Sequence, residues 1–386
     1  MALDPETFDL LKTTLQRFVR ERLVPREDEV AETNTIPEDI RAEMRELGLF
    51  GLSIPETFGG LGLDMEEEVT LAFELGKTSP AFRSLLGTNN GIGSQGLIMD
   101  GTEGQKQHYL PKLASGEMIA SFALTEAEAG SDARSLRTTA RRDGDDFILN
   151  GTKRYITNAP HAGLFTVFAR TQDPGNPEGS ITAFLVEAGT PGLSIGSVDK
   201  KMGQQGSLTS DVIFVDCRVP ASAVLGEKTG QGFRTAMKVL DRGRLHISAV
   251  CVGAAERLIA DSLDYAMERK QFGQPIAEFQ LVQAMLADSR AEAFAARCMV
   301  LETARAKDRA EVVTTDAACC KMYASEMVGR VADRAVQIHG GAGYMSEYAI
   351  ERFYRDVRLF RIYEGTTQIQ QLVIARNMIK QRKSEL

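Results

Sequence analysis

The spacing of apolar residues changes twice along the chain, and these two changes constrain the fold more than any other feature. Up to about residue 115, apolar residues recur at helical spacing, as at Phe8, Leu11 and Leu15. Short runs rich in β-branched and aromatic residues follow, and the helical period returns at Gly230. We therefore predict an α+β multidomain fold: an N-terminal helical domain over residues 1–117, a middle antiparallel β domain over 118–228, and a C-terminal four-helix bundle over 229–386.

Proline, glycine and turn pairs mark the predicted boundaries inside these regions. The first helix begins at Asp4-Pro5, because proline suits the first helical position, and it ends at Pro25. The turn pairs Asp143-Gly144 and Asn150-Gly151 separate predicted strands. The remaining early helices cover residues 37–47, 64–76 and 79–99, and the C-terminal helices break at residues 272–275, 307–309 and 340–344.

Composition excludes several classes of protein. The net charge of −8 argues against nucleic acid as the main partner, since phosphate binding usually needs a basic surface. The five cysteines are an odd number without CxxC spacing, and the four histidines share no ligand spacing, so we expect neither a disulfide framework nor a metal site. We see no signal peptide and no apolar run of about 18 residues. The sequence therefore predicts a cytoplasmic protein without a membrane span.

Glu364 lies in the segment with the clearest chemical signature. It follows Tyr363, precedes Gly365 and stands just before an apolar-periodic run that indicates a helix, with Thr366 as a candidate N-cap. A carboxylate held among apolar neighbours has a raised pKa, which suits a general base. Gly365 lets the backbone approach a ligand closely, and the helix N-terminus offers N–H groups to an anion. A polar turn between two helices explains the same residues without any chemistry.

Two motifs give this segment a family resemblance. Ile362-Tyr-Glu-Gly-Thr-Thr-Gln-Ile-Gln370, preceded by Gln337-Ile-His-Gly-Gly-Ala-Gly-Tyr344, resembles the C-terminal signature of the acyl-CoA dehydrogenase family. The order of helical, β and helical regions resembles that family's architecture. The resemblance implies an FAD-dependent enzyme in which Glu364 removes the α-proton of an acyl-CoA while a β-hydride passes to flavin N5, giving a trans-2-enoyl-CoA. It also implies that the backbone N–H of Glu364 and a ribityl hydroxyl polarise the thioester carbonyl.

The loop Thr125-Glu-Ala-Glu-Ala-Gly-Ser-Asp132 and the strand Lys153-Arg-Tyr-Ile-Thr-Asn158 resemble the family's flavin-contacting segments. Ala127 and Glu128 replace the family's proline and glycine in the loop. The chain has no tryptophan, and Tyr155 keeps an aromatic face where the family often has one. An ordinary polar turn and a plain β-strand are the alternatives. The resemblance assigns to FAD Phe122, Leu124, Thr125, Gly130, Ser131, Tyr155, Ile156, Thr157, Thr366 and Gln368.

A second group of cofactor contacts follows from Arg269-Lys-Gln-Phe-Gly-Gln-Pro275 and from the motif at Gln337. The planar fork of arginine suits phosphate, whereas an arginine near a helix end is usually a solvated charge. The resemblance implies that such residues reach the FAD of a neighbouring subunit, in an obligate homo-oligomer that is a dimer or a dimer of dimers (a homotetramer). It assigns to this group Arg269, Gln271, Phe272, Gln280, Gln337, Ile338, Gly340 and Gly341.

The segment Leu240-Asp-Arg-Gly-Arg-Leu245 bears on how the substrate is bound. Some relatives in the family place their base at the position of Gly243, which leaves Glu364 as the base here. The resemblance assigns to acyl-CoA Ser131, Asp241, Arg244, Gly365 and Arg376, and a structural ion pair is the alternative for Arg244. Small residues at Gly87, Thr88, Gly91 and Gly93 suit either a deep tunnel for a medium or long acyl chain or close helix packing.

The resemblance further implies that electrons pass to an electron-transfer flavoprotein and that the enzyme serves fatty acid β-oxidation in lipid metabolism. A flavin oxidase or monooxygenase on the same fold is one alternative. A catalytically silent relative that binds DNA through a basic surface is another, and the acidic charge balance and the intact Glu364 motif argue against it.

Overall fold

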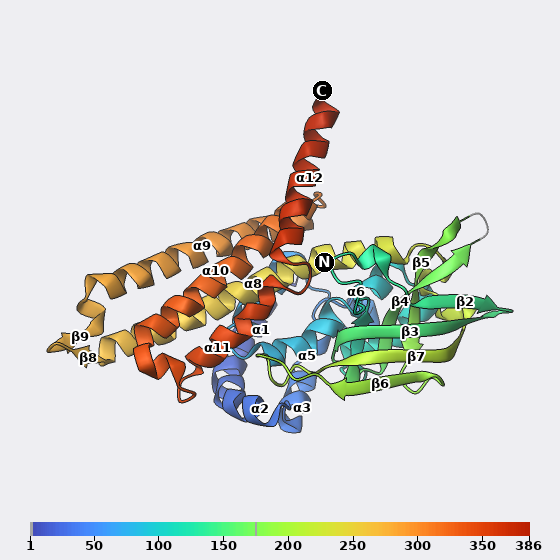
Figure 1. The fold of residues 1–386 in the computed structure, drawn as a ribbon. Helices are drawn as coiled ribbons and strands as arrows, with labels where there is room; N and C mark the ends of the chain where they lie inside the picture. The colour runs from blue at the N-terminus through green and yellow to red at the C-terminus, as the bar shows by residue number, and fades with distance from the viewer. Residues whose placement is uncertain (1–2, 174–175) are drawn as a thin grey trace.

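The computed structural model describes residues 3–173 and 176–386. Helices at the N-terminus, a sheet at one side and a group of long helices at the other meet at the centre of the molecule (Figure 1). Seven α-helices precede the sheet: α1 Pro5–Phe18, α2 Glu27–Thr33, α3 Glu38–Glu46, α4 Met65–Leu75, α5 Pro80–Asn90, α6 Gln95–Asp100 and α7 Glu103–Ala114.

The start of α1 is as predicted, because the Asp4 side chain accepts a hydrogen bond from the Thr7 N–H. The single helix predicted over residues 79–99 is wrong, since the chain leaves the helical conformation at Gly91 (φ −126°, ψ −114°) and re-enters a helix at Gln95. A Cβ at Gly91 would lie 2.7 Å from the Gly87 carbonyl oxygen, so this break requires glycine.

The middle of the chain forms β1 Ala120–Ala123, β2 Thr139–Asp143, β3 Asp146–Thr157, β4 Leu164–Asp173, β5 Asn176–Glu187, β6 Leu193–Val198 and β7 Thr209–Pro220. The sheet order is β1-β4-β2-β3-β7-β6, with β5 paired to β4. Most pairs are antiparallel as predicted, but β1 and β2 both pair with β4 in parallel. The predicted turn at Asn150-Gly151 is wrong: both residues lie inside β3, at a register shift against β7.

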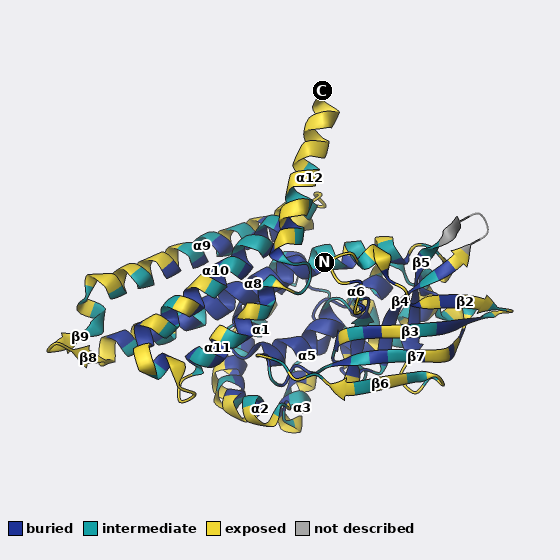
Figure 2. Ribbon diagram, viewed as in Figure 1, coloured by how far each residue is buried: buried dark blue, intermediate teal, exposed yellow. Residues whose placement is uncertain are grey.

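The C-terminal part contains α8 Gly232–Glu268, α9 Gln280–Asp308, α10 Thr314–His339, α11 Ala349–Val357 and α12 Thr367–Glu385, with a small hairpin of β8 Lys270–Gln271 and β9 Gln274–Pro275. The four long helices are present as predicted. Three of them, α8, α9 and α10, pack side by side, whereas α12 extends away from the molecule with its far end exposed (Figures 1 and 2). Helix α4 packs on α8 and α9 and completes that core.

Helix α5 joins the sheet to the long helices and is buried along its whole length (Figure 2). The Asn89 amide donates to the Leu113 and Met118 carbonyls (2.9 and 2.8 Å), and its oxygen accepts from the Ala120 N–H at 2.8 Å. These bonds satisfy backbone groups where β1 begins, so α5 is fixed against the sheet. Among the described residues, no helix combines the length and apolarity needed to cross a bilayer.

Candidate active site

Glu364 lies on a tight turn between a 3-10 turn, Arg358–Arg361, and α12. As predicted, Thr366 caps α12, its hydroxyl accepting from the Ile369 N–H at 3.3 Å. Glu364 and Gly365 have φ values of 53° and 89°. A glutamate in the left-handed region is strained, and such strain persists only where surrounding contacts fix the backbone.

Two buried side chains hold this turn. The Lys321 ammonium of α10 donates to the Gly365 carbonyl oxygen at 2.7 Å. The Gln370 amide donates to the carbonyl oxygens of Glu364 and Gly365 at 3.1 and 3.0 Å. Both side chains are fully buried, and both were missed from the sequence. One signal was available, because Lys321 falls in the apolar phase of its helix, where a charged residue needs a buried partner.

The Glu364 carboxylate is poised to accept a proton. Its Oε2 atom is buried and has no hydrogen-bond partner in the described part of the chain. Burial raises the pKa of Glu364, and the nearby cations of Arg83, Lys321 and Arg244 oppose part of that rise. Unpaired buried oxygens are rare in proteins, so this carboxylate is a candidate functional group.

Gly243 of α8 makes room for this carboxylate. A Cβ at position 243 would lie 2.3 Å from Glu364 Oε2 and 3.2 Å from Cδ. Positions 243 and 364 therefore face the same small volume, and only one of them can carry a side chain into it.

The first group of predicted cofactor residues gathers where β1 ends beside the bulge of β3. The Arg154 N–H donates to the Thr125 carbonyl at 2.8 Å, and the Ser121 hydroxyl donates to the Thr157 carbonyl at 2.7 Å. Tyr155 has φ 59° at this bulge and is 59% exposed. Phe122, Leu124 and Ile156 face the cores beneath, while Gly130 and Ser131 lie in the exposed loop that follows.

A buried ion pair fixes the loop over residues 125–132. Lys153, which is fully buried, donates to the Glu126 carboxylate at 2.7 Å and to the Leu124 carbonyl at 3.1 Å. Glu126 also accepts from the Thr138 N–H and hydroxyl at 2.9 and 2.5 Å. Burial lowers the pKa of Lys153 to about 8, although the Glu126 charge opposes this shift. Ala127 and Glu128 are exposed, so these buried contacts fix the loop without the family's proline and glycine.

Asn158, another residue missed from the sequence, ties β3 to α5. Its buried amide donates to the Ser84 carbonyl at 3.0 Å and to the Thr88 hydroxyl at 2.8 Å. The preceding residue on α5, Arg83, is close enough to Glu364 to influence its pKa. Helix α5 thus lies between the exposed bulge of β3 and the candidate base.

The structure brings only some of the residues predicted to bind acyl-CoA close together. Arg244 is buried and forms an ion pair with Asp241 at 2.5 Å, and Asp241 also accepts from the Thr314 hydroxyl at 2.9 Å. The structure therefore contains the ion pair that was the alternative role for Arg244. Gly365 lies in the same turn as Glu364, whereas Arg376 is exposed on α12.

The second group of predicted cofactor residues lies far from the first. The β8–β9 hairpin, with Arg269, Gln271 and Phe272, stands at the end of the long helices opposite the sheet (Figure 1). Gln280 begins α9 beside this hairpin. Gln337 and Ile338 lie in the last turn of α10, and Gly340 and Gly341 follow it in the 3-10 turn Gly340–Tyr344. Phe272 is 95% exposed. In contrast, Thr366 and Gln368 lie beside Glu364, at the start of α12.

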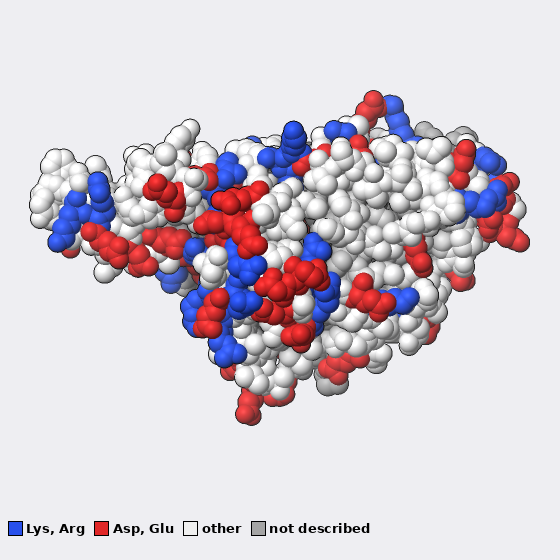
Figure 3. Space-filling model, turned by 90° about the horizontal axis from the view of Figure 1, so that it is seen from below, with Lys and Arg blue, Asp and Glu red and all other residues white. Residues whose placement is uncertain are grey.

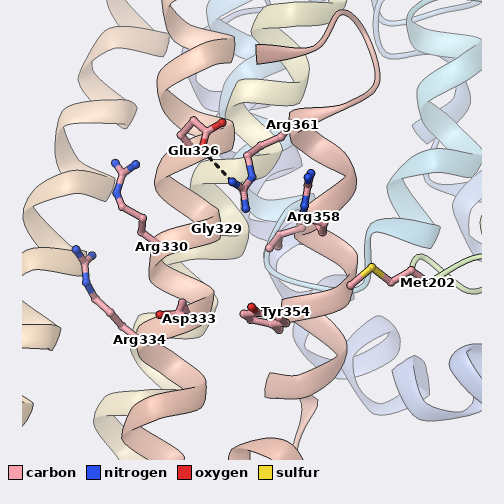
Figure 4. Close-up of a pocket in the computed structure, with 10 residues that line it drawn as sticks. Met202, Glu326, Gly329, Arg330, Asp333, Arg334, Tyr354, Arg358 and Arg361 are labelled. Carbon is pink, nitrogen blue, oxygen red and sulfur yellow. Dashed lines mark hydrogen bonds and ion pairs between the residues drawn. The ribbon is translucent and has the colours of Figure 1, made fainter. Parts of the chain in front are cut away.

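A basic cavity of about 600 Å³ opens between α10 and α11 (Figure 4). Four arginines line it together with Met202, Glu326, Asp333 and Tyr354: Arg330, Arg334, Arg358 and Arg361. Three of the four are paired with carboxylates, two with Glu292 and one with Glu326. The cavity does not include Glu364 and was not anticipated from the sequence.

Comparisons with known proteins define the class. Models of the acyl-CoA dehydrogenase N-terminal, middle and C-terminal domains match residues 5–117, 121–217 and 230–379. The chain is 42% identical to acryloyl-CoA reductase (NADH) of Anaerotignum propionicum, over 96% of this chain and 94% of that protein. It is 41% identical to the caffeyl-CoA reductase–Etf complex subunit CarC of Acetobacterium woodii, over 92% and 93%. The structure of butyryl-CoA dehydrogenase from Megasphaera elsdenii superimposes with a TM-score of 0.93 at 34% identity, covering 98% and 99%.

The fold and the site thus define an FAD-dependent oxidoreductase whose substrates are acyl thioesters. All three regions match in chain order. The chain belongs to the acyl-CoA dehydrogenase family.

Proposed function

We propose that the protein catalyses α,β-dehydrogenation of an acyl-CoA, with Glu364 as the base that takes the α-proton. The observation that carries this proposal is the buried Glu364 Oε2 atom, which has no partner in the described chain. Because burial raises its pKa, the carboxylate gains affinity for a proton while it remains close to Lys321 and Arg244. The thioester α-carbon would lie beside Gly243, where no side chain competes for the space.

The residues around the β3 bulge fit a flavin. The hydroxyls of Thr125, Ser131 and Thr157 have no hydrogen-bond partner within the described residues, so they are available to a ligand. We assign these hydroxyls and the Tyr155 ring to FAD, which when bound accepts the β-hydride. Glu364 would take the α-proton in the same reaction.

The backbone N–H of Glu364 suits the thioester carbonyl. It donates no hydrogen bond within the described part of the chain. A free N–H beside the base can donate to the carbonyl oxygen and stabilise the negative charge that develops there as the α-proton leaves. The clamp of Lys321 and Gln370 on the same turn keeps this donor in place.

We assign an electron-transfer flavoprotein as the electron acceptor, since one relative is named as a subunit of a reductase–Etf complex. That name, and that of acryloyl-CoA reductase, also favour a second candidate function, reduction of a 2-enoyl thioester. By microscopic reversibility the protonated Glu364 would then deliver a proton to the α-carbon, and its raised pKa serves this direction equally. If the enzyme works as a dehydrogenase, we propose that it serves fatty acid β-oxidation in the cytoplasm.

We further propose that the active enzyme is a homo-oligomer, a dimer or dimer of dimers, in which each cofactor contacts two chains. The β8–β9 hairpin lies at the end of the long helices, well away from β3 in the same chain (Figure 1). The basic cavity lies between them, from Arg361 near the base to Arg334, one turn before Gln337. We expect a second copy to cover this face and to bring its Arg269 and Gln337 to the first chain's β3 bulge.

The test is the visible spectrum of the purified protein, recorded anaerobically before and after addition of saturated acyl-CoA thioesters. A flavin band that bleaches supports the proposal, and a flavin that stays oxidised with every thioester contradicts it. Oxygen consumption as fast as dye reduction would favour the oxidase alternative. A salt-dependent gel shift would favour the DNA-binding alternative, for which the face in Figure 3 offers interleaved acidic and basic side chains.

A further inference from the structure

The loop between β6 and β7, residues 199–208, contacts both halves of the candidate site. At its end it is joined to β3, because the Asn158 N–H donates to the Leu208 carbonyl at 2.8 Å. The next residue, Thr209, pairs with Thr157 of β3, whose hydroxyl we assign to FAD. The middle of the loop lies against α11, the helix that leads towards the turn of Glu364.

Gln204 is the buried centre of this contact. It is 2% exposed and has a φ of 54°. Its backbone N–H donates to the carboxylate of Asp356, and its side-chain amide donates to the Asp356 carbonyl oxygen at 3.1 Å. Asp356 lies near the end of α11 and is itself fully buried. A residue other than glycine stays in the left-handed region only where such contacts fix it.

The backbone of this loop approaches α11 too closely for a side chain at position 203. A Cβ at Gly203 would lie 2.7 Å from Asp356 Oδ1 and 2.9 Å from the Arg355 carbonyl oxygen. The Arg355 guanidinium donates to the Met202 carbonyl at 3.0 Å. These contacts hold the loop and α11 together, although Gln204 and Asp356 are 152 positions apart in the chain.

The Gln204 side chain also reaches the residue that precedes Glu364. Burial raises the pKa of the Tyr363 hydroxyl, and a hydrogen bond with the Gln204 side chain opposes part of that rise. The Tyr363 ring packs against Phe360, with ring centroids 5.9 Å apart, and against the core of the long helices. Because Tyr363 and Glu364 share a peptide bond, a displacement of the tyrosine moves the carboxylate.

Gln204 differs from the clamp of Lys321 and Gln370 in the part of the chain that supplies it. Lys321 lies on α10 and Gln370 on α12, so that clamp ties the turn to the C-terminal helices. Gln204 lies between two strands of the sheet. Its contact with Tyr363 therefore fixes the turn of Glu364 relative to β3.

We propose that Gln204 is a positioning residue that fixes the distance between the Glu364 carboxylate and the FAD-binding edge of β3, through Tyr363 and Asp356. This inference rests on the proposed function, because the distance matters only if both sides act on one thioester. The α-proton and the β-hydride leave neighbouring carbons. A displacement of about 1 Å on either side can therefore lower the rate about a hundredfold.

The test is Gln204→Gly, which keeps the positive φ and the backbone bond to Asp356 and removes only the side chain. Under anaerobic single-turnover conditions, we expect flavin reduction to slow at least about tenfold. The FAD content and the Kd of the thioester should stay unchanged. An α-dideuterated thioester should slow the variant by a larger factor than the wild type, because a displaced carboxylate makes α-proton removal the harder step.

Gln205→Ala is the matched control. Gln205 lies in the same loop and accepts a hydrogen bond from Arg355 of α11 at 3.4 Å. We expect the wild-type rate and the wild-type isotope effect in this variant. A rate in Gln204→Gly equal to that of the control would overturn the inference and leave the proposed dehydrogenase intact.

Tyr363→Phe tests the route through the tyrosine, because it removes the hydroxyl and keeps the ring. In a Tyr363→Phe background, Gln204→Gly should lower the rate by a smaller factor than in the wild type, since the two residues share one hydrogen bond. Equal factors in both backgrounds would overturn the inference. If Gln204→Gly did not fold, a wild-type rate and isotope effect in Tyr363→Phe would overturn it as well.

Two further outcomes separate a structural role and the proposed function from this inference. A loss of rate in Gln204→Gly that only matches a loss of FAD would show that Gln204 supports the fold alone, and the inference would be wrong. Failure of the wild-type protein to reduce its flavin with any thioester would instead contradict the proposed function.

Discussion

The carboxylate of Glu364 occupies the space into which a side chain at position 243 would project, with only 2.3 Å between its Oε2 atom and the Cβ that Gly243 lacks. These residues are far apart in the chain, one on the long helix α8 and one on the turn before α12. Their proximity places the Glu364 carboxylate between two elements that are distant in the chain. It also explains why a chain with a glutamate at position 364 needs glycine at 243.

Gly243→Ala is therefore expected to displace the base without unfolding the protein. The added methyl group forces the carboxylate away from the thioester α-carbon, and a displacement of about 1 Å can lower the rate about a hundredfold. The measurement is the rate of anaerobic flavin reduction under single-turnover conditions. Gly104→Ala, in α7, is the matched control, because its Cβ would meet nothing within 4 Å. Equal rates in both variants would contradict the account.

The pH dependence of flavin reduction should report Glu364. The base must be ionised to take the α-proton, so the rate rises with pH through its pKa, which burial raises above the usual value of a glutamate. The Lys321 cation opposes that rise. Lys321→Met should thus move the acid limb of the profile to higher pH, and Lys321→Arg should restore part of the shift. An unchanged acid limb in Lys321→Met would exclude this electrostatic role.

Glu126→Gln is expected to destabilise the protein strongly, because it leaves the Lys153 ammonium buried without its counter-charge. Breaking a buried ion pair from one side costs about 3–5 kcal/mol. The measurement is the free energy of unfolding in denaturant, together with the FAD content, since the same pair fixes the loop over residues 125–132. Glu128→Gln is the control, because Glu128 is exposed in the same loop. A loss in the control as large as in Glu126→Gln would contradict the assignment.

Hybrid oligomers should test whether two chains build one site. Arg269→Ala and Glu364→Gln are each expected to be inactive when produced alone. In a mixed dimer, the site with an intact Glu364 receives an intact Arg269 from its partner, so co-production in equal amounts should restore about a quarter of the wild-type activity. Activity that stays at the level of the separate variants would mean that Arg269 serves its own chain.

Local chemistry was predictable from the sequence, whereas contacts between distant residues were not. The Thr366 cap and the glycine after Glu364 are local signals, and the structure has both. The clamp of Lys321 on Gly365 joins residues 44 positions apart, so no periodicity could reveal it. Strand β6 has mostly exposed residues, so it gives no apolar run that a sequence pattern could reveal. The break at Gly91 was missed because its cause is a contact with the Gly87 carbonyl.

Helix α12 also shows that a sequence pattern does not reveal contacts between distant parts of the chain. Its apolar residues predicted a packed helix, but Leu372, Met378 and Ile379 are 46%, 61% and 57% exposed in the single chain. The pattern shows that a helix forms, and it does not show which surface the helix packs against.

The most direct test of the central claim is Glu364→Gln, mixed anaerobically with an acyl-CoA substrate in D2O. We predict that the variant retains FAD and binds the thioester, but that flavin reduction and deuterium incorporation at the α-carbon both fall by about a thousandfold or more. The amide keeps the size of the side chain and removes only its ability to take a proton. Flavin reduction in Glu364→Gln at close to the wild-type rate would show that another group removes the α-proton.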